Sequence, residues 1–547
     1  MKKNLSIVIL LISLAISQSV FSQTYSFEKG KVPEGWKIDK GVLHISSEKY
    51  KSGSRSLQIK WKQNAVLTIP SPTGISEACR NRNGGMNAWI YNESPTKENL
   101  LFSFRDETGK EVCQLPFLLD FKGWRCFWAK FQGDMNMSSK SNIQSVEIQF
   151  PQHTKKGVTY IDLLEFTSKV SWQNMSDAQY KVNRTDYSLI PDFIGYRNAT
   201  PKVEKVITAE DNQITTITNR LTTWYLGSGQ HSSERWIKMR TENEKTFIRN
   251  GVKAAQKIKI QYTEDHTPQG EPLFPMGAPT IIDGQEAKKF RSINENILLP
   301  LALDYRKNQN DQSLKKALYI YDWFNDQGWA DGSSMGTLCF EKLRSSGYFH
   351  SFFLLKEQLS PEQLKRELQT MNWFTMFGAC YQLPSHAGEV ADNLRALAIP
   401  KLIYALSQND KQEREVALTA FKHYMDNALG IAPGFFGTFK ADFSGYHHRG
   451  SYHSAYYPHA LYAGALIAYL LHDTPYALSE TTLHNLKQGL LTFRFFCADL
   501  EVPAGTVGRF PKGQQILETL LPAFAYTALS FKEPDKAMSV PMERSGR

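Results

Sequence analysis

The sequence predicts a multidomain β + α protein, in which an N-terminal β-sandwich precedes an α/α toroid of helical hairpins. Residues 23–170 contain short apolar or alternating runs separated by Gly, Pro, Asn and Asp, which is typical of an all-β sandwich. From Trp236 onward, apolar residues recur at intervals of three and four, which indicates amphipathic helices. No repeat of fixed period is visible, so we expect hairpins packed in a ring rather than a solenoid of copied units.

The first 22 residues have the pattern of a secretory signal peptide. A lysine pair at positions 2 and 3 precedes an apolar run over residues 7–16, and small residues flank a cleavage point before Gln23. No later stretch approaches the eighteen or so consecutive apolar residues of a transmembrane helix. We therefore expect an exported protein, secreted or periplasmic, without a membrane span.

Composition bounds the classes of function. The chain has 547 residues, of which 41% are hydrophobic, so it can form several domains with sizeable cores. A formal charge of +10 suits a polyanionic partner, either nucleic acid or an acidic polysaccharide, although positive charge also serves solubility alone. The absence of a Gly-rich phosphate loop, HExxH and GxSxG argues against nucleotide-binding proteins, zinc peptidases and serine hydrolases. Six widely spaced cysteines do not form a disulfide scaffold; Cys113 and Cys126 either pair across strands or remain buried thiols.

Four segments of residues 23–170 resemble the jelly-roll sandwich that precedes many carbohydrate-active catalytic domains: SFEKG, YKSGSRSLQIKW, KGWRCFWAKF and TYIDLLEF. In that fold an early Glu and a late Asp often hold one calcium ion through oxygen ligands. Glu28 and Asp162 match those positions. The resemblance therefore implies one structural calcium ion and no organic cofactor; the alternative is that both are simple surface carboxylates.

Residues 171–235 are polar and mixed, and we expect a connecting segment that lies over the next domain. The toroid is assigned to residues 236–547. Its expected helices cover residues 294–303, 314–324, 349–359, 361–377, 393–406, 413–429, 458–471, 481–496 and 517–529. Neighbouring helices with short connections are typical of antiparallel hairpins.

Residues 442–475, DFSGYHHRGSYHSAYYPHALYAGALIAYLLHDTP, contain the groups best suited to catalysis. Three histidines and four tyrosines lie within residues 446–457, and an apolar helix with Pro458 in its first turn follows. A loop rich in proton-transfer groups and held by a buried helix is typical of an active site. The alternative is an aromatic surface loop with structural histidines.

The segments GYHHRGSYHSAYYP, LIAYLLHDTPY and VPAGTVGRF resemble the catalytic domain of polysaccharide lyase family 8, most closely the chondroitin sulfate ABC lyases. The resemblance implies β-elimination on a uronate-containing glycosaminoglycan such as chondroitin sulfate or hyaluronan. The proton on C5 is removed and the C4–O bond breaks, which leaves a 4,5-unsaturated sugar. The family also has C-terminal β-domains, which contribute a glutamate to the site. The chain ends at Arg547, so we expect these domains to be missing and the toroid to be incomplete.

The resemblance implies catalytic roles for His448, Tyr456 and Arg509, with His447 as the second choice for the histidine. The H-x-G-x-Y pattern favours His448, whereas in the hyaluronate-lyase spacing the tyrosine follows its histidine by nine residues, which favours His447. Arg509 would contact the glycosidic oxygen or the developing charge. The residues expected to bind substrate are Asn393, Tyr452, His453, Trp323, Trp329 and Trp373.

Two of these assignments have structural alternatives. Asn393 resembles the asparagine that hydrogen-bonds the uronate carboxylate, but it also suits a helix cap. The tryptophans offer stacking faces for sugar rings or fill the core. Residues 342–348, KLRSSGY, lack the histidine pair that ABC lyases carry before Gly-Tyr, which leaves dermatan cleavage open.

Three functions follow from these observations. The first is an exported glycosaminoglycan lyase, a monomer whose partner is an acidic polysaccharide rather than nucleic acid. The second is a glycosaminoglycan-binding protein that has lost turnover with its C-terminal part. The third is a toroid glycoside hydrolase, for which Asp442 and Asp473 would supply the two opposed carboxylates.

Overall fold

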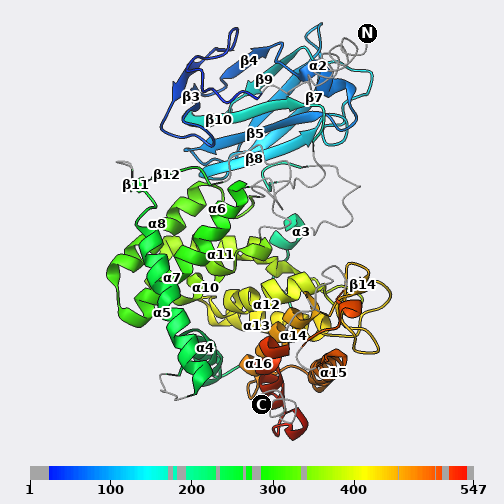
Figure 1. Ribbon diagram of the computed structural model, residues 1–547. Coiled ribbons are helices and arrows are strands. Elements are labelled where there is room, and N and C mark those ends of the chain that lie inside the picture. Colours follow the sequence, from blue (N-terminus) through cyan, green and yellow to red (C-terminus); the bar gives the residue numbers. More distant parts are fainter. Residues whose placement is uncertain are drawn as a thin grey trace, which may run out of the picture.

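The computed structural model describes residues 24–170, 177–181, 193–228, 234–262, 267–273, 285–333, 342–453, 455–498, 501–507 and 517–538. Figure 1 shows two parts, a strand-rich N-terminal part in blue and cyan and a helical part in green to red. The predicted signal peptide, Arg509 and Cys339 lie outside the described residues.

The N-terminal part is a sandwich of two five-stranded antiparallel sheets, as predicted. Facing phenylalanines fill the space between the sheets; the rings of Phe102 and Phe127, one from each sheet, are 5.2 Å apart. The strands of the first sheet, in spatial order, are β1 (Lys37–Ile38), β4 (Val66–Pro70), β9 (Ser145–Gln149), β6 (Asn99–Arg105) and β7 (Glu111–Leu118). Those of the second are β2 (Gly41–Ser46), β3 (Ser56–Lys62), β10 (Lys156–Thr167), β5 (Gly85–Asn92) and β8 (Gly123–Lys130). One short helix, α2 (Ile75–Arg80), lies between β4 and β5.

Strands β5 and β8 of the second sheet are buried on both faces, because the outer face of the sheet packs against the helices there. Figure 1 shows the helical part below β8. Along β5, Ala88 and Ile90 belong to the sandwich core, whereas Trp89 and Tyr91 belong to the core of the helical part. This division follows from the two-residue period of a strand. The Tyr91 hydroxyl also donates a 2.6 Å hydrogen bond to Asp326 at the end of a helix. The sandwich is therefore joined to the helices by apolar packing and by buried polar contacts.

Cys113 and Cys126 are both buried, and neither is in a disulfide. Cys113, on β7 of the first sheet, lies in the core of the sandwich, whereas Cys126, on β8, faces the core shared with the helices. The second sheet therefore separates the two thiols. Of the two alternatives that the sequence left open, the structure has buried thiols without a bond between them.

Within the described residues, the helical part is an α/α toroid of successive hairpins, also as predicted. Its hairpins are α7 (Leu299–Asn308) with α8 (Asp311–Asp326), α10 (Ser346–Leu355) with α11 (Pro361–Thr375), α12 (Ala391–Leu406) with α13 (Lys411–Ala428), and α14 (Tyr457–Leu471) with α15 (Glu480–Phe496), followed by α16 (Leu517–Leu529). The first helix of each hairpin contacts the first helix of the next, which gives the inner series α7, α10, α12, α14 and α16. Helices α10 and α14 are apolar almost all round, as expected for helices enclosed by others.

The structure contains helices that the periodicity did not predict: α3 (Phe193–Arg197), α4 (Asp211–Leu226), α5 (Arg235–Ala255) and α6 (Gln285–Ile293), with a π-helical turn at Asn294–Leu298. Helix α4 lies inside the segment that we interpreted as a connection. It is rich in threonine, which is a weak helix former because it is β-branched. Its threonine hydroxyls bond to carbonyls four residues earlier, and Ile217 and Leu221 are buried, so tertiary packing stabilises the helix.

Short elements complete the described chain. Two-stranded ribbons pair β11 (Ile260–Tyr262) with β12 (Pro268–Gly270) and β13 (Tyr446–His447) with β14 (Gly450–Ser451). Single 3-10 turns cover Lys342–Arg344, Lys356–Gln358, Phe377–Cys380, Ala504–Thr506 and Lys536–Met538. Among the described helices, none combines the length and the apolar character that crossing a membrane requires.

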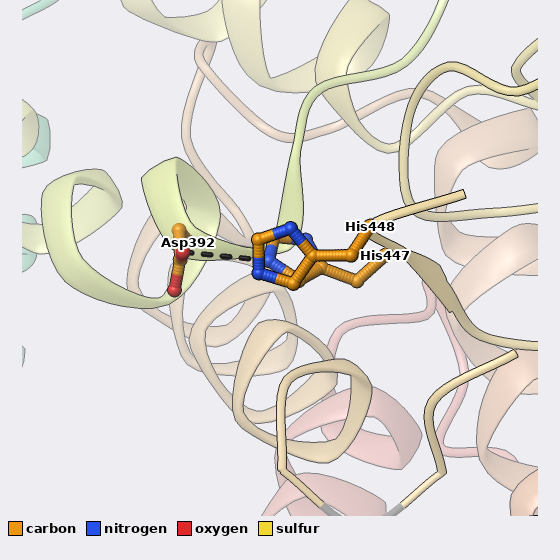
Figure 2. Close-up of side chains that lie close together, drawn as sticks. All are labelled: Asp392, His447 and His448. Carbon is orange, nitrogen blue, oxygen red and sulfur yellow. Dashed lines mark ion pairs between the residues drawn. The ribbon is translucent and has the colours of Figure 1, made fainter. Parts of the chain in front are cut away.

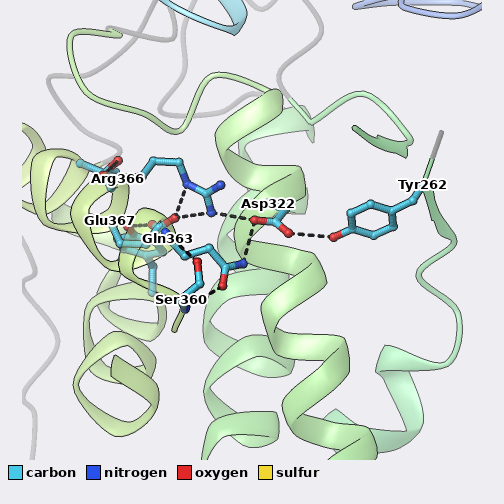
Figure 3. A network of polar contacts seen from close by, with 8 residues as sticks. Tyr262, Asp322, Ser360, Gln363, Arg366 and Glu367 are labelled. Carbon is cyan, nitrogen blue, oxygen red and sulfur yellow. Dashed lines mark hydrogen bonds and ion pairs between the residues drawn. The ribbon is translucent and has the colours of Figure 1, made fainter. Parts of the chain in front are cut away.

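A partly buried polar network joins α8 to α11 (Figure 3). Arg366 donates to Asp322 at 2.8 Å and to Glu367 at 2.8 and 2.9 Å. The other oxygen of Asp322 accepts from Tyr262 at 2.9 Å, and the other oxygen of Glu367 accepts from Tyr348. Glu367 is only 1% exposed, and burial raises its pKa although Arg366 and Tyr348 oppose the rise. Every carboxylate oxygen of this network has a donor, so it fixes the positions of the two helices.

Candidate active site

The β13–β14 ribbon places two histidines side by side. His447 pairs with Gly450, so His448 and Arg449 form a two-residue turn, with φ of 47° and 63°. Such turns need the left-handed region at both central positions, which non-glycine residues seldom adopt. The turn leaves His448 exposed to solvent, whereas His447 is 7% exposed.

Aromatic rings surround this pair. Tyr456 is the N-cap residue of α14, and its ring stacks on that of His447 with centroids 4.0 Å apart. The His448 ring lies 4.0 Å from His447 and meets Tyr456 edge-on at 5.4 Å. Tyr452 closes the group, with its ring 5.3 Å from Tyr456 and 6.0 Å from each histidine. Four of the residues predicted from the sequence therefore form one cluster.

Asp392, at the start of α12, points its carboxylate toward the rings of His447 and His448 (Figure 2). Its Oδ2 atom lies 3.4 Å from Nε2 of His447, and its Oδ1 accepts from Nε of Arg395 at 2.7 Å. Burial raises the pKa of Asp392, but the opposing effect of the neighbouring His447 and Arg395 is larger, and the pKa falls to about 2. We did not predict a role for Asp392 or Arg395; their i, i+3 spacing in ADNLRAL was the available signal.

Asn393 follows Asp392 on the same turn of α12 and is half-buried. Its amide donates a 3.2 Å hydrogen bond to Glu389, whose other oxygen accepts from Tyr424 at 2.9 Å. The helix begins after Val390, which is the N-cap residue, so Asn393 is not the cap of this helix. Its amide is held in place beside the histidine cluster.

A cavity of about 430 Å³ adjoins the cluster through Arg395, which lines it. The other lining residues come from α4, the π-helical turn, α10, α12, α14 and the turn before α10. They include five cationic, imidazole-bearing or aromatic residues: Arg344, His350, His459, Trp224 and Tyr462. Glu295 is the carboxylate among them. Cationic side chains beside aromatic faces suit an acidic sugar, since the rings cover the sugar faces and the cations pair with its anionic groups.

Four of the predicted substrate-binding residues lie away from this surface. Trp323, Trp329 and Trp373 are at most 1% exposed, so none presents a ring face to a ligand. Our interpretation of these tryptophans as stacking faces for sugar rings is therefore wrong. The alternative, that they fill the core, is confirmed. His453 is 2% exposed; its Nδ1 contacts the Ser451 hydroxyl and its ring packs on Phe496. It packs between the β13–β14 ribbon and Phe496, and it is not accessible to a ligand.

An exposed aromatic group that we did not predict lies on the loop between α13 and β13. Phe435 is 77% exposed, and its ring is 6.4 Å from that of Tyr446 on β13. Phe436 on the same loop is 38% exposed and contacts His386. The sequence signal was the phenylalanine pair between glycines in PGFFGTF. These rings offer the stacking faces that the buried tryptophans do not.

The two carboxylates considered for hydrolysis do not form a pair. Asp442 precedes β13, near the start of α14, whereas Asp473 follows the end of that helix and contacts His472 and Arg220. A 15-residue helix separates them by about 22 Å, well beyond the 5–10 Å spacing of glycosidase carboxylates.

Glu28 and Asp162 hold the same loop of the sandwich from two sides. Asp162 is fully buried and accepts from the backbone of Lys51, Ser52 and Leu163, while Glu28 accepts from Ser54 and Arg55. Burial raises the pKa of Asp162 to about 7, although the hydrogen bonds from the backbone oppose this rise. The negative charge of Glu28 adds to it. Oδ1 of Asp162 and Oε2 of Glu28 each accept a single hydrogen bond, so both keep capacity for a cation.

Comparison with known proteins identifies both parts of the chain. A family model described as "Lyase, catalytic" matches residues 200–541, and one described as "Lyase, N terminal" matches residues 21–182. The chain is 26% identical over 526 residues to a chondroitin sulfate ABC exolyase of Bacteroides thetaiotaomicron, covering 90% of this chain and 49% of that protein. It is 24% identical over 569 residues to a chondroitin sulfate ABC endolyase of Proteus vulgaris, covering 95% of this chain and 54% of that protein.

The chain thus spans about half the length of the curated relatives it matches. Among solved structures, a Paenibacillus xanthan lyase aligns with a TM-score of 0.48 at 12% identity, covering 61% of this chain and 30% of that one.

Proposed function

The chain belongs to the lyase family of the chondroitin ABC enzymes, and from this premise we propose that it cleaves a uronate-containing glycosaminoglycan by β-elimination. The observation that carries the proposal is the cluster of His447, His448, Tyr452 and Tyr456, in which every neighbouring ring pair lies within about 6 Å. The curated relatives are chondroitin sulfate lyases, which supports chondroitin sulfate as the first substrate to examine.

The chemistry needs a base beside C5, an acid beside the leaving oxygen and a group that stabilises charge on the uronate carboxylate. His448 is exposed and Tyr456 is half-buried, so a sugar can reach both. We assign the proton transfers to this pair. His447 is covered by Tyr456 and faces Asp392, which suits a residue that orients its neighbours. Asn393, fixed by Glu389, is assigned to the carboxylate, and Arg509 to the leaving oxygen.

The test is a screen of the purified full chain against chondroitin, dermatan, hyaluronan and heparan sulfate. We expect ultraviolet absorbance from a 4,5-unsaturated product with at least one polymer. Salt-sensitive binding without any such product would overturn the lyase assignment and favour the glycosaminoglycan-binding alternative, because charge pairing with a polyanion weakens as ions screen it. Cleavage to products without the double bond would instead indicate hydrolysis.

We also propose that Glu28 and Asp162 hold one calcium ion, since two carboxylates share a loop and burial disfavours the charge of Asp162. Oxygen ligands of this kind are those that calcium prefers. After chelation, added Ca²⁺ at 100 times its dissociation constant should stabilise the fold by about 2.7 kcal/mol. Thermal unfolding of Asp162→Asn should show no such gain, whereas Asp106→Asn, in an exposed turn, should keep it. An equal gain in both variants would place calcium elsewhere.

Export through the N-terminal 22 residues stays part of the proposal, supported by the lysine pair and the apolar run. The size of the exported protein, measured by mass spectrometry, tests the cleavage point before Gln23. We also propose that the protein acts as a monomer. Sedimentation analysis tests that state.

A further inference from the structure

Asp392, His447 and His448 form a group with the composition of a metal site (Figure 2). Each residue offers one ligand atom, and the three atoms lie within 4.8 Å of one another. Within the part of the chain that the structure describes, this is the only such group of three or more His, Cys, Asp or Glu residues. Two imidazoles and one carboxylate suit zinc and other divalent transition metals, whereas calcium and magnesium prefer oxygen ligands alone.

The Nε2 atom of His447 gives an independent indication. It is buried in a residue that is 7% exposed, and it has no hydrogen-bond partner. Buried polar atoms without a partner are rare in native proteins and call for an explanation. This atom points at Oδ2 of Asp392 from 3.4 Å, without the geometry of a hydrogen bond. Two ligands of a tetrahedral zinc ion, each bound at its usual length, also lie about 3.4 Å apart.

The surroundings allow an ion to enter and to be held. Arg395 occupies Oδ1 of Asp392 at 2.6 Å, which orients the carboxylate and leaves Oδ2 toward the histidines. Outer hydrogen bonds of this kind position metal-binding carboxylates. His448 is exposed, so a small rotation of its side chain can close the remaining gap while the solvent side stays open to water. The positive charge of Arg395 opposes a second cation, so the affinity should be moderate.

We propose that Asp392, His447 and His448 bind one divalent transition-metal ion, for which zinc is the probe, and that its binding inhibits the enzyme. A ring nitrogen bound to zinc can neither accept nor donate a proton, so an occupied site blocks the step assigned to His448. The metal site stands on its own geometry, whereas the inhibition rests on the proposed lyase function.

The binding test uses the purified full chain after chelation, with zinc titrated against a fluorescent zinc indicator. We expect one ion per chain with micromolar affinity. Asp392→Asn and His448→Ala should each weaken it about tenfold or more. The matched control is His44→Gln, which removes an exposed histidine from β2 and should bind zinc like the wild type. Zinc uptake that is absent, or equal in wild type and both site variants, would overturn the proposal.

A second measurement separates this proposal from the proposed function. Substitution of cobalt(II) for zinc should produce visible absorption bands in the wild type and in His44→Gln, and His448→Ala should lose or shift them. This spectrum requires no turnover, so it reports on the site even if no polymer is cleaved. With an active enzyme, zinc should inhibit wild type and His44→Gln over the concentration range in which it binds, and a chelator should reverse the inhibition. Stoichiometric binding without inhibition would overturn the inhibitory role.

Discussion

Two polar clusters of the helical part both combine carboxylates with nitrogen-bearing side chains, but they differ in how far their hydrogen bonds are satisfied. In the network of Asp322, Arg366 and Glu367, each carboxylate oxygen accepts at least one hydrogen bond (Figure 3). In the cluster of Asp392, His447 and His448, a buried ring nitrogen has no hydrogen-bond partner (Figure 2). A satisfied network holds helices in place, because opening it would leave buried charges unpaired. A cluster with spare bonding capacity can instead act on a ligand.

The largest effect is expected from breaking the satisfied network. Arg366→Ala leaves Glu367 buried without its cation, so the free energy of unfolding should fall by about 3–5 kcal/mol. Urea denaturation followed by circular dichroism measures this loss. Lys245→Ala, which breaks an exposed ion pair with Glu242, is the control and should lose about 0.5 kcal/mol or less. A loss below about 1 kcal/mol in Arg366→Ala would mean that the network is not a structural element.

The next effect concerns the open cluster and should change rate rather than stability. Tyr456→Phe removes one oxygen and keeps the ring, so turnover should fall about 10²-fold or more while the melting temperature and substrate affinity change little. Steady-state kinetics on the cleaved polymer measures it.

The neighbouring Tyr457→Phe is the matched control for this prediction. The Tyr457 hydroxyl donates to the carbonyl of Phe443 at 2.7 Å and lies in the core, so its loss should cost about 1 kcal/mol of stability and leave turnover unchanged. Tyr452→Phe should be milder than Tyr456→Phe. Full activity in Tyr456→Phe together with inactive Tyr452→Phe would assign the proton to Tyr452 instead.

The smallest effect concerns His350, a histidine whose nearest polar partner is the hydroxyl of Tyr225. Burial lowers its pKa to about 4, below the ordinary value of 6.5. Between these values the unfolded chain binds more protons at this residue than the native chain. Its contribution therefore makes the unfolding free energy fall as the pH drops from about 6.5 to about 4. Urea denaturation of His350→Gln at several pH values should show a shallower fall, whereas His44→Gln should follow the wild type.

How much of the structure could be predicted from the sequence depends on the kind of pattern that each part carries. Apolar periodicity placed the helices from α7 to α16, because those helices bury a face and so carry a pattern. It missed α4, whose threonines favour strands and whose helix depends on packing against α7 and α14. The density of His and Tyr predicted the histidine cluster at the β13–β14 ribbon, since residues close in the sequence stay close in space. Asp392 is far from the β13–β14 ribbon in the sequence, and only the fold brings it within 3.4 Å of His447. No local sequence pattern predicts this contact.

Burial was the main source of error in the candidate site. A tryptophan in a helical pattern looks the same in the sequence whether it faces a groove or the core, and Trp323, Trp329 and Trp373 all face the core. The burial of His453 was equally hard to predict, because it depends on packing against Phe496, which lies in α15. The exposed rings of Phe435 and Phe436 lie in a loop without periodicity, so their only sequence signal was the phenylalanine pair between glycines.

The strand β5 has a consequence for how such proteins can be rearranged. Its alternate residues serve two different cores, with Ala88 and Ile90 on one side and Trp89 and Tyr91 on the other. A sandwich transplanted onto another helical partner would carry Trp89 and Tyr91 into solvent, and the helices left behind would expose the apolar surface that these rings cover. Exchange of this N-terminal part between relatives should therefore succeed only when the facing helix surface is exchanged with it, so the two parts are expected to evolve as one unit.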